Sequence, residues 1–184
     1  MKTIKSFTLL VLSFIAFSAC SDDDSGPAPI NEEEIITTLT VTLVPNGGGS
    51  TIILQTRDLD GDGPNAPEVT VSGDLLANTV YEGSLVLLNE TETPAENITD
   101  EVETEAEEHQ FFYTIGGGLD AVTEYADFDV NGNPLGIQFT LTTGDASAGT
   151  FGVTLRHEPA KPNTGLVDAG GETDIAVTFN VSVQ

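Results

Sequence analysis

The sequence has few basic residues, a single cysteine and no tryptophan. Five Lys and Arg side chains stand against 30 Asp and Glu side chains in 184 residues, which gives a formal net charge of −25 at pH 7. This charge excludes nucleic-acid binding, because phosphate contacts require a basic surface, and it disfavours direct contact with anionic lipid. Cations and basic partners remain candidates, although an acidic surface also keeps an exported protein soluble without any ligand. One cysteine cannot form an intrachain disulfide, so apolar burial or bound metal must hold the fold.

An apolar stretch near the N-terminus is too short to span a bilayer. It runs from Phe7 to Phe17 and follows Lys2 and Lys5, whereas a membrane-spanning helix needs about 20 apolar residues. A basic start, a short apolar core and small residues after it are typical of a secretory signal peptide. We therefore expect residues 1–19 to be a signal peptide, whose removal would take away two of the five basic residues and no acidic one.

The only cysteine, Cys20, would become the first residue after this cleavage. The residues before it resemble the lipobox of bacterial lipoproteins, although Phe17 replaces the usual leucine. The resemblance implies that Cys20 is lipidated, with palmitate-type acyl chains that anchor the protein in a membrane. Ser21–Asp24 resembles the acidic tag with which Bacteroidetes lipoproteins are displayed on the cell surface. We expect a lipid-anchored outer-membrane protein, exposed at the cell surface.

Two regions follow the signal peptide. Residues 20–34 are polar, acidic and contain proline, so they cannot bury a core and are predicted to form a flexible tether. Residues 35–184 are predicted to form one domain, in which apolar and polar residues alternate as in half-buried strands. Seven segments are predicted strands: residues 35–43, 50–57, 79–89, 109–115, 136–142, 149–157 and 173–183.

Glycine- and asparagine-rich turns separate these strands. Short strands with such punctuation predict an all-β fold, an Ig-like antiparallel β-sandwich of about seven strands. In the last strand Ile175 and Val177 are expected to face the core, with Asp174 on the side that faces water. One short amphipathic helix is expected within residues 93–108, with Thr99 as its N-cap.

Two acidic loops begin like calcium-binding loops. Asp58, Asp60 and Asp62 place carboxylates at alternate positions before a glycine, and they are candidate calcium ligands. Val69 stands where an EF-hand requires glutamate, so an EF-hand is disfavoured and a plain Asp-Gly turn is the favoured alternative. Residues 127–132 repeat the spacing, but Asn-Gly is a strong hairpin signal, so a hairpin is favoured there over calcium.

The two histidines offer a different kind of site. His109 and His157 are each adjacent to a glutamate, Glu108 and Glu158 respectively, and each lies on an inward-facing stripe. His109 opens its predicted strand and His157 closes its own, so antiparallel pairing would bring both to one end of the sandwich. Imidazole and carboxylate together suit zinc or a similar transition metal. The alternative is that both histidines only satisfy local hydrogen bonds.

The sequence lacks the motifs of common catalytic sites. It has neither a Gly-x-Ser-x-Gly elbow nor a phosphate-cradling glycine-rich loop before a helix. We expect a protein that is not an enzyme. Its many carboxylates leave a polysaccharide-active enzyme as an alternative, which the lack of tryptophan for sugar stacking disfavours.

Five segments spread over most of the chain carry a family resemblance: Arg57–Gly73, Glu107–Tyr113, Asn131–Gly136, Thr154–Pro159 and Gly170–Val181. They resemble flavobacterial lipoproteins described as "type 1 periplasmic binding fold superfamily" proteins. The resemblance implies an accessory to a TonB-dependent outer-membrane receptor. The fold in that description requires alternating strands and helices in two lobes, whereas the residues here favour the sandwich.

Together these observations predict a non-enzymatic binding module at the cell surface. Its expected cofactor is a divalent metal, either zinc-like at the histidines or calcium at the Asp58 loop. The alternatives are a structural or adhesive module without a small ligand, and the polysaccharide-active enzyme.

Overall fold

The computed structural model describes residues 34–61 and 63–184 of the protein. Cys20, Asp62 and the predicted signal peptide therefore lie outside the described residues. The elements in chain order are β1 (Thr38–Pro45), β2 (Ile52–Arg57), β3 (Glu68–Val71), β4 (Val80–Asn89), β5 (Glu96–Asn97), α1 (Ile98–Thr104), β6 (His109–Gly116), β7 (Ala121–Tyr125), β8 (Gln138–Thr143), β9 (Ser147–His157), α2 (Leu166–Ala169) and β10 (Glu172–Val183).

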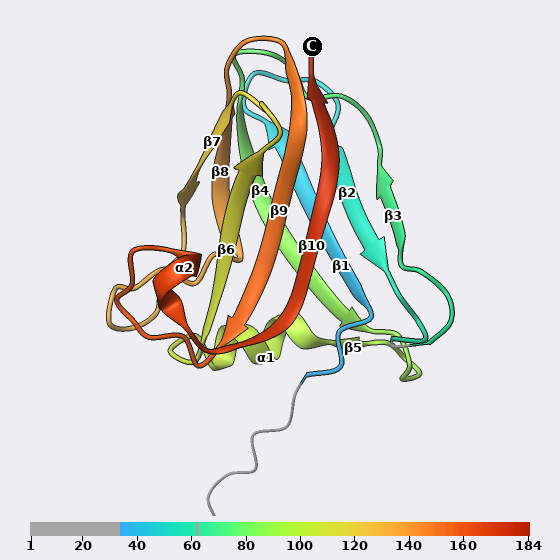
Figure 1. The fold of residues 1–184 in the computed structure, drawn as a ribbon, viewed down its shortest axis with the longest axis vertical. Helices are drawn as coiled ribbons and strands as arrows, with labels where there is room; N and C mark the ends of the chain where they lie inside the picture. Colours follow the sequence, from blue (N-terminus) through green and yellow to red (C-terminus); the bar gives the residue numbers. More distant parts are fainter. Residues whose placement is uncertain (1–33, 62) are drawn as a thin grey trace, which may run out of the picture. The chain divides into compact units, whose positions relative to one another are not determined.

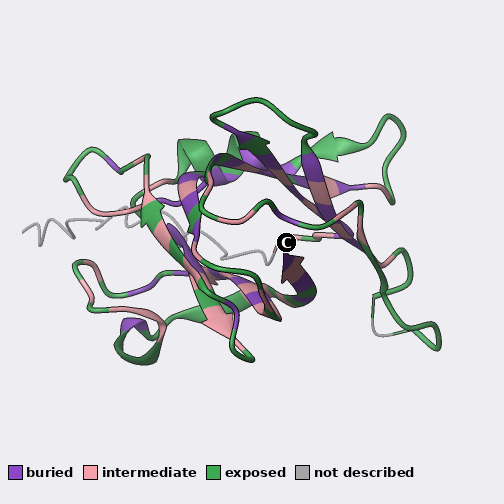
Figure 2. Ribbon diagram, turned by 90° about the horizontal axis from the view of Figure 1, so that it is seen from above, coloured by how far each residue is buried: buried purple, intermediate pink, exposed green. Residues whose placement is uncertain are grey.

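The strands form two antiparallel sheets, as the sequence predicts (Figure 1). The larger sheet has the order β3-β2-β1-β4-β8-β7, with β5 paired to β4, and the smaller sheet has the order β10-β9-β6. Apolar side chains of both sheets pack into one core, so the predicted all-β sandwich is confirmed. Figure 2 shows the buried stretches along the strands of both sheets.

All seven predicted strands are present, and three further strands were not predicted. β3 is exposed at three of its four positions and β5 has only two residues. In β7 no residue is fully buried. Segments of this kind lack the contrast between a buried and a solvated face on which strand prediction depends.

Glycine shapes the core where β4 meets β8. Gly83 pairs with Phe139, and a Cβ on Gly83 would lie 2.4 Å from the aromatic ring. The Tyr113 ring lies nearby, tilted by 34°, with its centroid 4.2 Å from that of Phe139. Gly83 therefore lets an aromatic cluster fill the space between the two sheets.

Helix α1 lies within the predicted segment but has a different N-cap. The Asn97 side chain accepts a hydrogen bond from the Thr99 backbone N–H. Thr99 is itself buried, and its hydroxyl accepts a hydrogen bond from the Leu87 backbone N–H at 2.8 Å. The predicted cap at Thr99 is wrong because this hydroxyl joins the helix to β4 instead. Helix α2, of only four residues, was not predicted.

The loop between β7 and β8 confirms the hairpin at residues 127–132. β7 and β8 pair antiparallel, and Phe128 and Pro134 form a bridge within the connecting loop. The Gly132 N–H donates to the Asp129 carbonyl at 3.0 Å, which closes the turn. The Asp129 carboxylate accepts from the backbone N–H groups of Asn131 and Asn133, each at 2.9 Å.

Candidate metal centre

The two histidines meet at one end of the smaller sheet. β6 and β9 pair antiparallel, and their register places His109 directly opposite His157. The imidazole centroids are 4.5 Å apart and the rings are tilted by 32°. The prediction that the two histidines share one end of the sandwich is confirmed.

The carboxylate of Glu34 bridges the two imidazoles. Its Oε1 lies 2.9 Å from His109 Nε2, and its Oε2 lies 3.6 Å from His157 Nδ1. The three side chains are buried, with exposed fractions of 4% for Glu34, 0% for His109 and 6% for His157. An acidic side chain is rarely buried to this extent unless it is paired with a cation or a proton donor.

Asp174 completes the cluster from near the start of strand β10. The register between β9 and β10 shifts between Thr173 and Ile175, so Asp174 is the extra residue of a β-bulge. A bulge re-aims a side chain relative to the strand alternation, and Asp174 Oδ2 is buried. The prediction that Asp174 faces water is wrong for this reason.

Four side chains therefore converge at this end of the sandwich: Glu34, His109, His157 and Asp174. Each offers one ligand atom, and these atoms lie within 4.8 Å of one another. The structure thus contains a Glu/His/Asp cluster that could hold a metal ion.

The surroundings of His109 restrict what lies between it and Glu34. His109 Nδ1 is 3.2 Å from the backbone carbonyl of Glu105, which can only accept a hydrogen bond. Nε2 faces a second acceptor, the Glu34 carboxylate. A neutral imidazole has only one N–H, so if Nδ1 donates to Glu105, the contact between Nε2 and Glu34 requires a second proton or a metal cation.

The contact to Glu105 follows a pattern common in metal centres. An imidazole that binds metal through one nitrogen usually donates the N–H of the other to a carbonyl or carboxylate. α1 ends at Thr104, just before Glu105, so the helix terminus positions this carbonyl. The contact with the Glu105 carbonyl would orient the His109 ring, so that Nε2 is directed at the metal.

The distances in the cluster also suit a tetrahedral ion. Zinc bonds of about 2.1 Å with tetrahedral angles separate neighbouring ligand atoms by about 3.4 Å. The observed separations of 2.9 and 3.6 Å lie on either side of this value. Among the described residues Glu34 Oε2 has no hydrogen-bond partner, so this buried oxygen is available as a ligand.

The two glutamates beside the histidines in sequence lie outside this cluster. Glu108 and Glu158 are exposed and group with His157 alone. The Glu158 backbone N–H donates to the Glu108 carbonyl at 2.6 Å, which holds the two residues side by side. Glu108, His157 and Glu158 thus form a second, more exposed group that could hold a metal ion, whereas His109 lies with Glu34 and Asp174 in the buried cluster. The structure therefore divides the predicted set, with His157 in both groups.

A buried lysine, Lys161, also contacts the start of β6. Lys161 Nζ donates to the carbonyls of Ala106 and His109, at 2.6 and 2.5 Å, and lies 3.4 Å from Asp129 Oδ2. Burial lowers the pKa of Lys161 against the opposing effect of Asp129. Burial would raise the pKa of Asp129, but hydrogen bonds from Asn133 and the Lys161 charge lower it overall.

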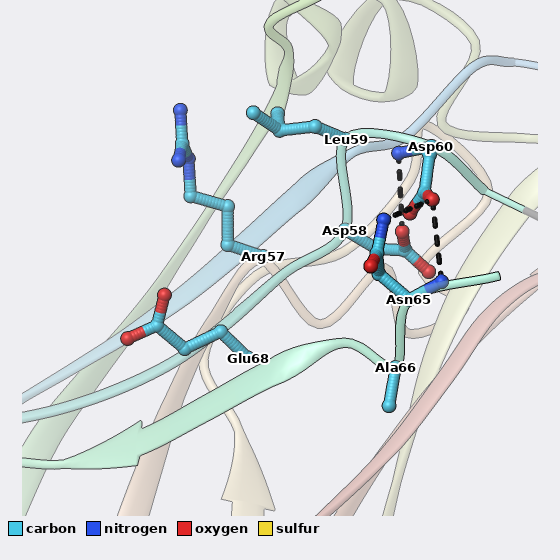
Figure 3. Close-up of a pocket in the computed structure, with 7 residues that line it drawn as sticks. All are labelled: Arg57, Asp58, Leu59, Asp60, Asn65, Ala66 and Glu68. Atoms are coloured by element: carbon cyan, nitrogen blue, oxygen red, sulfur yellow. Dashed lines mark hydrogen bonds between the residues drawn. The ribbon is translucent and has the colours of Figure 1, made fainter. Parts of the chain in front are cut away.

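The Asp58 loop has internal partners for its carboxylates (Figure 3). Asp60 Oδ2 accepts from the side-chain amide of Asn65 at 2.7 Å and from its backbone N–H at 3.3 Å. Asp58 Oδ1 accepts from the Asp60 N–H at 3.3 Å. These contacts form a turn, and because Asp62 lies outside the described residues, calcium binding by the three aspartates stays a prediction.

Within residues 34–61 and 63–184, no helix is long and apolar enough to cross a membrane. No protein-family model, curated protein or solved structure matches the chain. The functional argument therefore rests on the geometry of the cluster.

Proposed function

We propose that this protein is a non-enzymatic metal-binding module that holds zinc or a similar transition metal at Glu34, His109 and His157, with Asp174 as the fourth ligand. The observation that supports it best is the buried carboxylate between two imidazoles that face each other across β6 and β9. Two nitrogen and two oxygen ligand atoms within 4.8 Å of one another form a donor set that zinc accepts.

The donor set favours a transition metal over calcium. Calcium takes six to eight oxygen ligands in a flexible shell, whereas this cluster offers two imidazoles and two carboxylates in a buried space. Imidazole binds zinc, copper, iron and nickel, and carboxylate selects less strongly among metals. The buried cluster is therefore proposed as a zinc-like centre, distinct from the predicted calcium ligands Asp58, Asp60 and Asp62.

The cellular setting is proposed from the sequence. A lipid anchor at Cys20 on the outer membrane would place the metal centre at the cell surface, where it takes up ions from outside or from a neighbouring protein. From the family resemblance, we propose that the protein acts as an accessory to a TonB-dependent uptake receptor.

One alternative has structural support of its own. A proton on His109 Nε2 would satisfy the 2.9 Å contact to Glu34 without any metal. The cluster would then be an ion pair that fastens the start of the domain to β6, in a structural or adhesive module.

Calorimetric titration separates the metal proposal from this alternative. The full chain, stripped of metal with a chelator, is titrated with zinc and with calcium, alongside the variants Glu34→Gln and Glu158→Gln. We expect saturable zinc binding that Glu34→Gln weakens by at least about tenfold, the lower bound for losing even an outer-shell partner. Glu158→Gln is the matched control and should bind zinc as the unaltered chain does.

Two results would contradict the proposal. The first is the absence of zinc binding in the unaltered chain, together with a melting temperature that zinc does not raise, since a ligand of the folded state must stabilise it. The second is an equal loss of zinc affinity in Glu34→Gln and Glu158→Gln. The first result would leave the ion pair as the role of Glu34, and the second would show that zinc binding does not depend on the Glu34 carboxylate in particular.

A further inference from the structure

Strand β10 is a long edge strand that lacks the usual protection against pairing. It has 12 residues and pairs only with β9 among the described strands. Edge strands are commonly protected by lysine, by proline or by short length. Residues 172–183 contain neither lysine nor proline. The bulge lies at the start of the strand, and Leu75 bridges Val183 at its end, so the regular edge without such a bridge lies between Ile175 and Val181.

The outward-facing backbone groups of β10 follow from its register. The Ser182 carbonyl accepts from the Leu75 N–H at 2.8 Å, so Ser182 presents its backbone groups away from β9. The register between β9 and β10 is continuous from Ile175 to Val183. In an antiparallel ladder this orientation alternates, so Ala176 and Thr178 also point their N–H and C=O groups to the open edge.

A groove runs along this part of the edge. Its volume is about 760 Å³, within the range of roughly 300–1,000 Å³ that is usual for ligand sites. Ala176 and Thr178 line one side together with Ile175, and Ile36 and Val69 line the other. The groove therefore offers unpaired backbone groups beside apolar side chains, which are the two features that an added strand requires.

The charged residues that line the groove indicate the charge of the partner that it binds. Asp58 and Asp174 line it, and its described lining includes no lysine or arginine. A second copy of this chain would bring another net charge of −25 to the interface, which self-repulsion disfavours. A basic segment of another protein would instead meet a complementary charge.

We propose that the open edge of β10 at Ala176 and Thr178 binds an extended segment of a partner protein by β-strand addition. The segment has alternating apolar side chains that pack against Ile175 and Val69, and a basic side chain at the end that faces Asp58. This surface is independent of the proposed metal function, apart from Asp174, which lies at the border of both.

The test uses a defined peptide as the probe. An acetylated peptide with alternating valine and threonine and a lysine at each end is titrated against the full chain in chelator, so that metal does not contribute. One control peptide carries glutamate in place of both lysines, and another carries N-methyl groups that block its backbone donors. We expect saturable binding of the lysine peptide only, weakened by added salt.

Proline at position 176 provides the matched variant. Because the Ala176 N–H faces the open edge, Ala176→Pro removes no hydrogen bond to β9, and edge strands tolerate proline at such positions. We expect Ala176→Pro to weaken peptide binding by at least about tenfold, since it removes a donor and blocks the edge, whereas Ala176→Thr should bind normally.

Amide hydrogen exchange on the unaltered chain is a second test, which does not depend on whether Ala176→Pro folds. Bound peptide should slow exchange at Ala176 and Thr178. Unchanged exchange at both amides, or equal binding of the glutamate peptide, would overturn the proposal. Dimerisation of the chain that Ala176→Pro abolishes would also overturn it, in favour of a second copy as the occupant.

Discussion

At the scale of single residues, Glu90 shows how the fold changes the ionisation of one carboxylate. Arg57 donates to Glu90 through Nε at 2.9 Å and through Nη2 at 2.7 Å. The Thr38 hydroxyl donates to the same carboxylate at 2.5 Å. The hydrogen bonds from Arg57, followed by that from Thr38, lower the pKa of Glu90 to about 2.

The first prediction concerns this pKa. In an NMR titration of the side-chain carboxyl carbons, Glu90 should titrate near pH 2, and Arg57→Gln should raise its pKa toward 4.5. Because the folded-state pKa is below the unfolded one, the pair stabilises the fold above about pH 4.5, and this stabilisation is lost as the pH falls toward 2. Thr38→Val should raise the pKa by less. A Glu90 pKa that Arg57→Gln leaves unchanged would show that the pair does not persist in solution.

The residues of the metal cluster differ in how well the sequence predicts them. His109 and His157 could be placed together, because each occupies the end of a strand with clear alternation. Glu34 could not, because it ends an acidic run that resembles a solvated tether. Asp174 could not either, since its inward direction depends on a bulge that period-two alternation does not show.

At the scale of elements, strand prediction succeeded where one face of the strand is buried. β1, β4 and β9 each show this contrast along their length. It failed for β3, which is mostly exposed, for β5, which has only two residues, and for β7, in which no residue is fully buried. The start of β6 depends on contacts distant in sequence, chiefly the ammonium group of Lys161 under the carbonyl of His109.

The second prediction tests this contact between elements. Lys161→Met should destabilise the fold by roughly 3 kcal/mol, because it leaves the buried Asp129 carboxylate without its cation and two carbonyls without this donor. The measurement is the free energy of unfolding in urea. Asp129→Asn together with Lys161→Met should cost less than the two single losses added. Strict additivity would show that the two side chains act independently.

At the scale of the whole molecule, the acidic charge and the lack of disulfides acquire a structural context. Thirty acidic side chains and a single cysteine leave the domain to be held by its apolar core and by polar clusters such as the one at Glu34. Metal in that cluster would join Glu34, the first described residue, to the three strands of the smaller sheet, β6, β9 and β10. Ion binding would then fix where the proposed tether leaves the domain.

The measurement that tests this account most directly is an anomalous difference map from crystals of the full chain grown with zinc. The account predicts one peak within about 2.0–2.2 Å of His109 Nε2, His157 Nδ1 and a Glu34 oxygen. A zinc peak at Glu108 and Glu158 without His109, or no peak between the two imidazoles at saturating zinc, would contradict it.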